Sequence, residues 1–332
     1  MAQMKYFYEL TISSSPHAHS PVTTQTIMRD VLIALVPALL GSIYFFGFRS
    51  LLVTLVSAAA CVFFEWGFCK VRKLHCKTYD LSAVVTGVLL AFVCPVTIPY
   101  WTIILGDFFA IVLVKMLFGG LGKNIVNPAL AGRAFLFSWP VLMSNWVKVG
   151  FSNAAGLLST ADAVTAATPM SAMHQGALPE ESILDMFLGN IGGCIGETSA
   201  LLLIIGFIYL LYRKVITARI PLAYIGTVAI LAFLFPQGND RIAWMAAQVF
   251  GGGLMLGAIF MATDYVTSPL TKLGQIVYGI GCGVITILIR YFGGYSEGVT
   301  YAILCMNACA VLLDKIGRPV KFGAPKKEAA KK

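Results

Sequence analysis

Charged side chains are scarce in this sequence. Only 12% of its 332 residues are Asp, Glu, Lys or Arg, and acidic residues number just 15, whereas hydrophobic residues make up 58% of the chain. Soluble domains carry roughly 25% charged residues. So little charge and so much apolar surface exclude an ordinary soluble domain, and the composition predicts a polytopic membrane protein.

Two further absences narrow the class of protein. The eight Cys residues contain no C-x-x-C pair, which disfavours iron–sulfur ligation, and we predict no metal site. Cys305 and Cys309 share a helix face, but small packing residues explain that spacing. We expect no secretory signal peptide, because the first 26 residues are polar and no small-residue cleavage site follows a short apolar run.

Long hydrophobic runs are abundant. Ten of them are candidates to cross a hydrocarbon core of about 30 Å, and helices are expected because unpaired backbone groups are costly in lipid. The runs are 27–46, 50–69, 81–98, 101–118, 129–146, 190–212, 220–235, 242–262, 276–292 and 299–313. Several are short or contain Gly and Pro, which indicates broken or half-length helices inside a bundle. We therefore predict an all-α membrane protein of about ten transmembrane helices.

The chain shows weak internal similarity. The stretch "LVKMLFGGLGKNIVNPALAGRAF" after the fourth run and "ILIRYFGGYSEGVTYAILCMNAC" after the ninth share an aromatic-Gly-Gly turn that leads into a further helix. Five helices separate the two, an odd number, so equivalent halves would be inverted in the membrane. We expect an inverted five-plus-five repeat.

The positions of Lys and Arg predict the orientation. With the N-terminus inside, most of the 24 Lys and Arg residues, Arg133 included, lie on the inner side, and Lys115 falls within a span. Only Arg49, Lys148, Arg241 and Arg290 lie outside. The positive-inside rule favours this topology, so we attribute the net charge of +9 to membrane orientation and not to nucleic-acid binding.

This topology divides the chain into five parts. They are a cytoplasmic N-terminal segment (1–26), a first transmembrane half (27–146), an extracytoplasmic loop (147–189), a second transmembrane half (190–314) and a basic cytoplasmic tail (315–332).

The extracytoplasmic loop carries the segment "DAVTAATPM", which begins at Asp162. Ordinary loop chemistry can explain this segment: Asp162 is a candidate N-cap, and Pro169 stops any helix that begins there. A functional explanation is also open. Ala166 and Ala167 leave the hydroxyl of Thr168 unobstructed, as a modifying enzyme requires of its acceptor.

The segment from Asp162 to Thr168 resembles the flavinylation signature of Rnf and sodium-pumping NADH:quinone oxidoreductase complexes. In that signature, FMN is joined by a phosphodiester bond to the last Thr; the signature usually carries Gly where this chain has Ala166. The stretches "SSSPHAHSPVTTQTIMRDVLIALVPALL", "FGGLGKNIVNPALAGRAF" and "FMATDYVTSP" extend the resemblance over nearly the whole chain. They are similar, in order and spacing, to D subunits of Rnf complexes, the ion-translocating ferredoxin:NAD oxidoreductases. The homologous B subunits of the sodium-pumping complexes usually have a longer N-terminal extension.

The resemblance implies a cofactor and partners. Thr168 is expected to hold covalent FMN on the extracytoplasmic face, with Asp162 and Thr165 shaping the loop and Ala166 and Ala167 giving access. A second, non-covalent flavin (riboflavin) is a further expectation, which no residue pattern locates. The implied partners are the A, B, C, E and G subunits, a flavin transferase, membrane lipid, and sodium ions or protons. The implied location is a bacterial inner membrane.

Ion translocation requires ionisable groups within the bundle, where they are costly and usually functional. The candidates are Asp107, Lys115, Glu197 and Asp264. Asp107 and Lys115 are eight residues apart, about 12 Å along a helix, so each needs a partner elsewhere. Glu197 follows three Gly residues and could build an oxygen-lined sodium site, or equally a structural hydrogen bond. Glu65 and Asp264 are close to helix ends, where interfacial positions would explain them.

Two classes of function remain open at this level. The first is a membrane subunit of a redox-driven ion pump, with covalent FMN, in electron transfer between ferredoxin and NAD. The second is a passive channel or secondary transporter with an inverted repeat and no redox role. Covalently bound flavin is the observation that separates them.

Overall fold

The computed structural model describes residues 22–73, 78–143, 145–147, 168–179, 181–238 and 240–315. Within these residues all regular elements are helices, as the sequence predicts. Four residues assigned to the FMN loop, Asp162, Thr165, Ala166 and Ala167, lie outside the described residues. The same holds for nearly all of the predicted N-terminal segment and basic tail.

The first half of the chain contains six α-helices, a short 3-10 helix (η1) and a π-helix (η2) within the described residues. They are α2 (Thr24–Phe46), α3 (Phe48–Val71), η1 (Thr78–Asp80), α4 (Ser82–Phe92), α5 (Tyr100–Phe108), η2 (Phe109–Met116), α6 (Pro128–Leu136) and α7 (Pro140–Met143). The π-helix η2 directly continues α5.

The second half contains eight α-helices and a second π-helix, η4, within the same described part. They are α8 (Pro169–His174), α9 (Ile183–Leu188), α10 (Ala200–Tyr212), α11 (Arg219–Leu234), α12 (Arg241–Phe250), α13 (Leu254–Leu256), η4 (Gly257–Met261), α14 (Lys272–Phe292) and α15 (Val299–Leu313).

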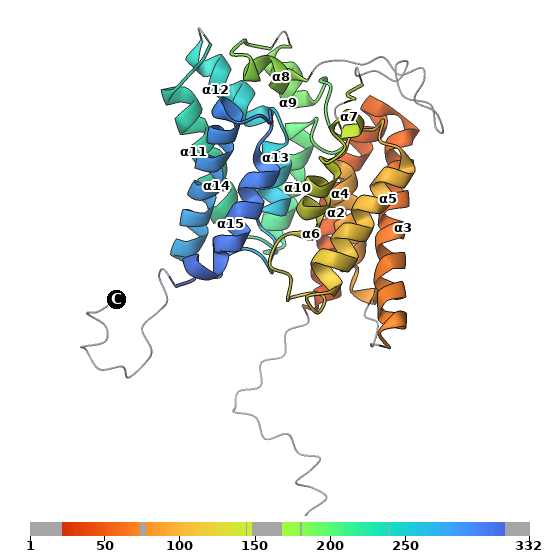
Figure 1. The fold of residues 1–332 in the computed structure, drawn as a ribbon. Helices are drawn as coiled ribbons and strands as arrows, with labels where there is room; N and C mark the ends of the chain where they lie inside the picture. Colours follow the sequence, from red (N-terminus) through yellow and green to blue (C-terminus); the bar gives the residue numbers. More distant parts are fainter. Residues whose placement is uncertain are drawn as a thin grey trace, which may run out of the picture.

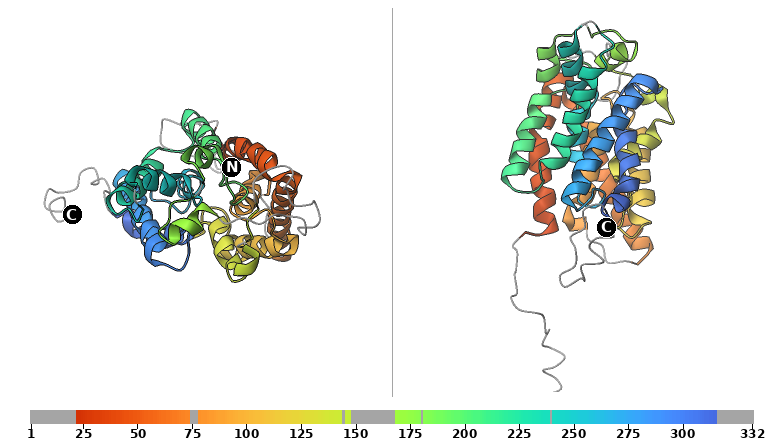
Figure 2. Two further views of the ribbon diagram at one scale, coloured as in Figure 1. Left: turned by 90° about the horizontal axis from the view of Figure 1, so that it is seen from above. Right: turned by 90° about the vertical axis from the view of Figure 1, so that its left-hand side faces the viewer.

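The long helices form a bundle with two distinct ends (Figure 1). The short helices α7, α8 and α9 cover one end, which we call the loop end; α2 begins and α15 finishes at the opposite end, the terminal end. Most neighbours come from the same half, but α10 packs against α2, and α6 packs against α15. A helix of each half therefore packs against a helix of the other half. Figure 2 shows α10 beside α2 from above and from the side.

Helix starts follow recognisable local signals. Asn127 caps α6 by accepting hydrogen bonds from the backbone N–H groups of Ala129 and Leu130, and Pro128 occupies the first helical position. Ser199 caps α10 in the same way through the N–H of Leu202. These two caps matter because both helices begin inside the bundle.

The predicted number of spans is supported only in part. Among the described residues, α2, α3 and α14 are long and apolar enough to cross a membrane alone, and α12 with α13 and η4 makes a fourth if this bent pair counts as one span. Ten spans therefore stay a prediction.

Broken helices, by contrast, are plainly present. The bend between α12 and α13–η4 is 58°, at Gly252 and Gly253, whose φ angles are +65° and +67°. The run 190–212 is helical only from Ala200, and the run 81–98 only as far as Phe92. The predicted boundaries of these two spans are wrong, because hydropathy does not distinguish a helix from an apolar loop that is buried in protein.

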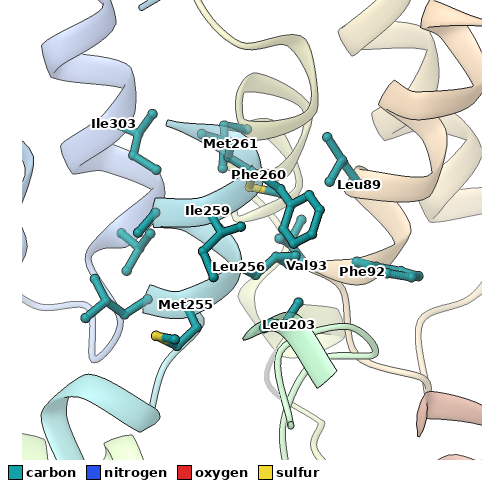
Figure 3. Close-up of a cluster of buried hydrophobic side chains, with 14 of the residues drawn as sticks. Leu89, Phe92, Val93, Leu203, Met255, Leu256, Ile259, Phe260, Met261 and Ile303 are labelled. Atoms are coloured by element: carbon teal, nitrogen blue, oxygen red, sulfur yellow. The ribbon is translucent and has the colours of Figure 1, made fainter. Parts of the chain in front are cut away.

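The central core surrounds α13 and η4, the second part of the bent helix pair. Phe260, Leu256 and Ile259 of α13 and η4 are buried. They lie among Leu89, Phe92 and Val93 from α4 and its end, Leu203 from α10 and Ile303 from α15 (Figure 3). Side chains from both halves thus meet around one short helix, which fixes the position of the neighbouring loops.

Candidate functional site

Thr168 is the last residue before α8, at the loop end. Its backbone carbonyl accepts hydrogen bonds from the N–H (2.9 Å) and the hydroxyl (2.7 Å) of Ser171, while its own side chain makes no cap hydrogen bond. Only 9% of Thr168 is exposed. Pro169 at the first helical position fixes the start of α8, so the position of Thr168 is set by a helix and not by the preceding loop.

Thr168 lines a small cavity of about 20 Å³. The other walls come from two Gly-rich segments, Ile191–Gly193 and Gly252–Gly253, and from the carboxylates Glu197 and Glu297. The structure therefore brings the predicted flavin attachment residue beside Glu197, a residue predicted for the ion path. The two predictions meet at one site.

The two carboxylates belong to an ion-pair network that we call the Arg133 cluster: Arg133, Glu197 and Glu297. Arg133 Nη1 lies 2.9 Å from Glu197 Oε1, and Nη2 bonds Glu297. Nη2 also lies 3.5 Å from Cys194 Sγ. Arg133 is only 2% exposed, and its Nε has no hydrogen-bond partner among the described residues. A buried guanidinium held by two carboxylates is stable only while both partners stay in place.

The cluster is assembled from three distant parts of the chain. Arg133 is on α6, Glu197 lies just before α10, and Glu297 lies just before α15. Gly253 allows the close approach, because a Cβ at that position would lie 2.5 Å from the Glu197 carboxylate. The Gly residues ahead of Glu197 pointed to such a loop in the sequence, but nothing there indicated Arg133 or Glu297 as its partners.

Three potential metal ligands occur in this cluster. Ligand atoms of Cys194, Glu197 and Glu297 lie within 4.8 Å of one another. The guanidinium of Arg133 already contacts all three, so a cation bound there would have to displace it. The set is better described as an ion-pair network.

Arg290 brings a second positive charge to the loop end. It is 2% exposed, and its guanidinium donates to the carbonyls of Gln248, Gly251, Gly252 and Glu297 and to the side-chain oxygen of Gln248. All of these acceptors are neutral. Arg133 and Arg290 together balance the two carboxylates, so an anionic group attached to Thr168 would enter a surrounding with no net negative charge.

These findings correct part of the charge count. Arg133, assigned to the inner side, is buried within the bundle. Arg49 and Arg290, assigned to the outer side, are buried as well; Arg49 donates to the carbonyls of Val96 and Ile98. Such residues hold loops together, and they weigh less in the orientation rule than exposed charges do.

Asp107 and Lys115 do not pair with each other, as their spacing predicts. Lys115 Nζ lies 3.0 Å from Glu65 Oε1 and donates to Ser82 Oγ at 2.7 Å. Asp107 Oδ1 accepts from Ser57 Oγ (2.7 Å) and Cys61 Sγ (3.2 Å). Glu65 is only 6% exposed, so the interfacial explanation for this residue is wrong.

Ser57, Cys61 and Glu65 follow one another at intervals of four residues on α3, so they share a helix face. With Asp107 and Lys115 they form a buried polar group that we call the α3 column. Asp107 Oδ2 and Glu65 Oε2 have no hydrogen-bond partner among the described residues. Buried carboxylate oxygens without partners are unusual and point to water or an ion as the missing partner.

The α3 column borders two cavities toward the terminal end. Glu65 lines one of about 760 Å³ with Tyr79 and Asp80. Lys115 and Asp264 line a much smaller one of about 80 Å³, which Asn124 and Asn127 also border. Asp264 accepts a hydrogen bond from the hydroxyl of Thr267 at 3.0 Å. The predicted ion-path residues therefore fall into two separate places, with Glu197 at the loop end and the others nearer the terminal end.

Comparison with known proteins gives consistent matches over nearly the whole chain. The model of the NQR2, RnfD, RnfE family matches residues 11–323. The D subunit of the Na(+)-translocating ferredoxin:NAD(+) oxidoreductase complex of Acetobacterium woodii is 46% identical over 96% of this chain and 96% of its own length. The D subunit of the proton-translocating ferredoxin:NAD(+) oxidoreductase complex of Clostridium ljungdahlii is 44% identical over 94% of this chain and 96% of its own length.

A more distant relative agrees with these two. The D subunit of the ion-translocating oxidoreductase complex of Actinobacillus succinogenes is 35% identical over 93% of this chain and 96% of its own length. All three matches cover nearly the full length of both chains, so the resemblance predicted from short motifs is confirmed.

Proposed function

The chain belongs to the NQR2, RnfD, RnfE family, and from this premise we propose that it is the D subunit of an ion-translocating ferredoxin:NAD oxidoreductase. In this role it is a multi-pass membrane subunit of a redox-driven ion pump, and it takes part in electron transfer coupled to sodium or proton translocation. The full-length similarity to subunits with these names carries the proposal. A passive channel or secondary transporter has no comparable support.

The proposal includes FMN covalently attached to Thr168. The position of this residue supports it, since Thr168 borders a cavity with Glu197 and Glu297 and its hydroxyl makes no cap hydrogen bond. A volume of about 20 Å³ is far below that of a ligand pocket. The cavity has room only for the group next to the Thr168 hydroxyl, and the flavin ring needs a different place. Bound FMN would supply a carrier that passes one or two electrons.

The remaining parts of the proposal concern assembly and topology. We assign to the chain ten crossings as an inverted repeat, cytoplasmic termini and an extracytoplasmic FMN loop in a bacterial inner membrane, with the A, B, C, E and G subunits as partners and a flavin transferase for maturation. The opposite positions of α8 and the start of α2 agree with this topology. The cavity beside Asn124 and Asn127, lined by apolar side chains and a few polar ones, is the candidate place for the second, non-covalent flavin.

The attachment is tested by separating the protein on a denaturing gel and measuring flavin fluorescence. The wild-type chain from cells that hold the transferase should give a fluorescent band, and Thr168→Val should give none. Thr198→Val is the matched control, because Thr198 lines the same cavity and is buried; its band should persist. A dark wild-type band, or a bright Thr168→Val band, would reject covalent FMN at this residue.

The part of Glu197 in ion movement is tested in reconstituted complex. Glu197→Gln removes the charge but retains the shape and one acceptor for Arg133. Ion uptake driven by ferredoxin oxidation should slow while the fluorescent band stays. Unchanged coupled uptake would remove Glu197 from the ion path and leave it a structural partner of Arg133.

A further inference from the structure

A second cavity at the loop end lies next to the Thr168 cavity. It measures about 250 Å³, and its walls come from the end of α6, from α7 and from the Gly294–Gly298 segment before α15. Glu297 lines both cavities. The same side chain therefore borders the cavity of the attachment residue and this larger space.

The larger cavity is walled by aromatic rings. Phe137, Tyr295 and Tyr301 form a cluster, with ring centroids 5.7 Å apart for Phe137 and Tyr295 and 4.9 Å apart for Tyr295 and Tyr301. Phe137 and Tyr301 are stacked at 6.1 Å. Trp146 adds a fourth ring to the lining. Flat aromatic surfaces of this kind bind flat aromatic ligands by stacking.

The cluster is unusual because it is incompletely covered. Tyr295 is 48% exposed, although the rings around it are held in contact. The guanidinium of Arg133 lies 5.4 Å from the centre of the Phe137 ring, and Arg133 Nε has no hydrogen-bond partner among the described residues. The cavity thus combines an open aromatic wall with the carboxylate of Glu297, which Arg133 neutralises, a surrounding that suits a flat, electron-poor ring.

We infer that the cavity walled by Phe137, Tyr295 and Tyr301 receives the isoalloxazine ring of the flavin attached to Thr168. This inference rests on the proposed function, because it requires the covalent attachment. It explains why the Thr168 cavity is too small for the ring. Glu297 borders both cavities, and the two Tyr side chains would hold the ring by stacking.

The test uses a property that activity does not report. A Tyr ring stacked on a flavin quenches its fluorescence by donating an electron to the excited ring, whereas Phe keeps the shape and cannot donate. The full-length chain is produced with the transferase and placed in lipid nanodiscs. Flavin emission is then measured in the native and the denatured state, after subtraction of the Thr168→Val spectrum to remove any non-covalent flavin.

The wild-type chain should be strongly quenched in the native state. Tyr295→Phe combined with Tyr301→Phe should raise native emission several-fold and leave denatured emission unchanged. Tyr44→Phe is the matched control, because Tyr44 is an exposed tyrosine at the loop end of α2 outside this cavity; it should behave as the wild type does.

Each contrary result has its own meaning. If the denatured wild-type chain carries flavin but native emission is the same in the wild type and in the double variant, the ring lies elsewhere and the inference is wrong while the attachment stands. If the denatured wild-type chain carries no flavin, the attachment is wrong and the inference falls with it.

Discussion

The Arg133 cluster and the α3 column are both buried polar groups, but the atom left without a hydrogen-bond partner among the described residues is a donor, Arg133 Nε, in the first and carboxylate oxygens in the second. In the Arg133 cluster, each carboxylate bonds the guanidinium, and the three residues come from three distant segments. In the α3 column, Glu65 and Asp107 each keep one oxygen without a partner among the described residues. The first arrangement holds a fixed geometry, and the second leaves acceptors for a mobile ion or water.

The cavities support this contrast. The Arg133 cluster shares its space with Thr168, the proposed attachment residue. The α3 column borders two cavities toward the terminal end through Glu65 and Lys115. From this difference we propose that the loop end positions the redox group, whereas the interior of the first half offers a path for ions.

The largest expected effect comes from removing the centre of the fixed cluster. Arg133→Met leaves two carboxylates buried without a cation, which costs about 3–5 kcal/mol of stability for a buried pair. We expect a much lower unfolding temperature in detergent and a poor yield. Adding Glu197→Gln and Glu297→Gln to Arg133→Met should restore much of the loss. A stable Arg133→Met single variant would show that the cluster does not hold the loops together.

Breaking the Lys115–Glu65 pair should have a smaller effect. Lys115→Met leaves Glu65 without its cation, but Glu65 borders a large cavity and can be hydrated there. We expect a loss of about 1–3 kcal/mol, below that for Arg133→Met. In Lys115→Met combined with Glu65→Gln most of the loss should disappear. Thermal unfolding of the wild type, Lys115→Met, Glu65→Gln and the double variant in one detergent measures these losses. If Lys115→Met lost as much stability as Arg133→Met, the two polar groups would not differ in the way described above.

The smallest effect on stability is expected at Asp107. A substitution there should lower ion uptake while stability hardly changes. Asp107→Asn keeps an acceptor for Ser57 and removes a buried charge, so the free energy of unfolding should change by less than about 1 kcal/mol. Coupled ion uptake should nevertheless fall, with the flavin band of Thr168 intact. Ser57→Ala is the control for the hydrogen bond alone. Full uptake by Asp107→Asn would exclude the α3 column from the ion path.

The sequence predicted the local features of the site well. The separate partners of Asp107 and Lys115 and the Gly-rich approach to Glu197 both follow from residues close together in the chain, whereas flavin attachment at Thr168 stays a prediction. The sequence did not predict the burial or the partners of Arg133, because these partners lie 64 and 164 residues away in the chain. A charge count assigns such an Arg to the nearest face of the membrane, because only the tertiary fold shows that two carboxylates meet it inside.

Span boundaries were predictable for the long helices and not for the broken ones. The helix α3 matches its hydrophobic run closely. The segments after α4 and before α10 belong to hydrophobic runs as well, but they are not helical. Their backbone groups find partners in each other, and this pairing between distant segments has no signal in the hydropathy of either one.

That pairing joins the two halves of the chain. The N–H groups of Ile195 and Gly196 donate to the carbonyls of Cys94 (3.0 Å) and Phe92 (2.9 Å), so the end of α4 is capped by the approach to α10. Rocking one half against the other would strand these amides in an apolar interior at a cost of several kcal/mol. These backbone hydrogen bonds thus hold the two halves together, so we expect an ion that crosses this chain to move between neighbouring side chains while the halves keep their relative positions.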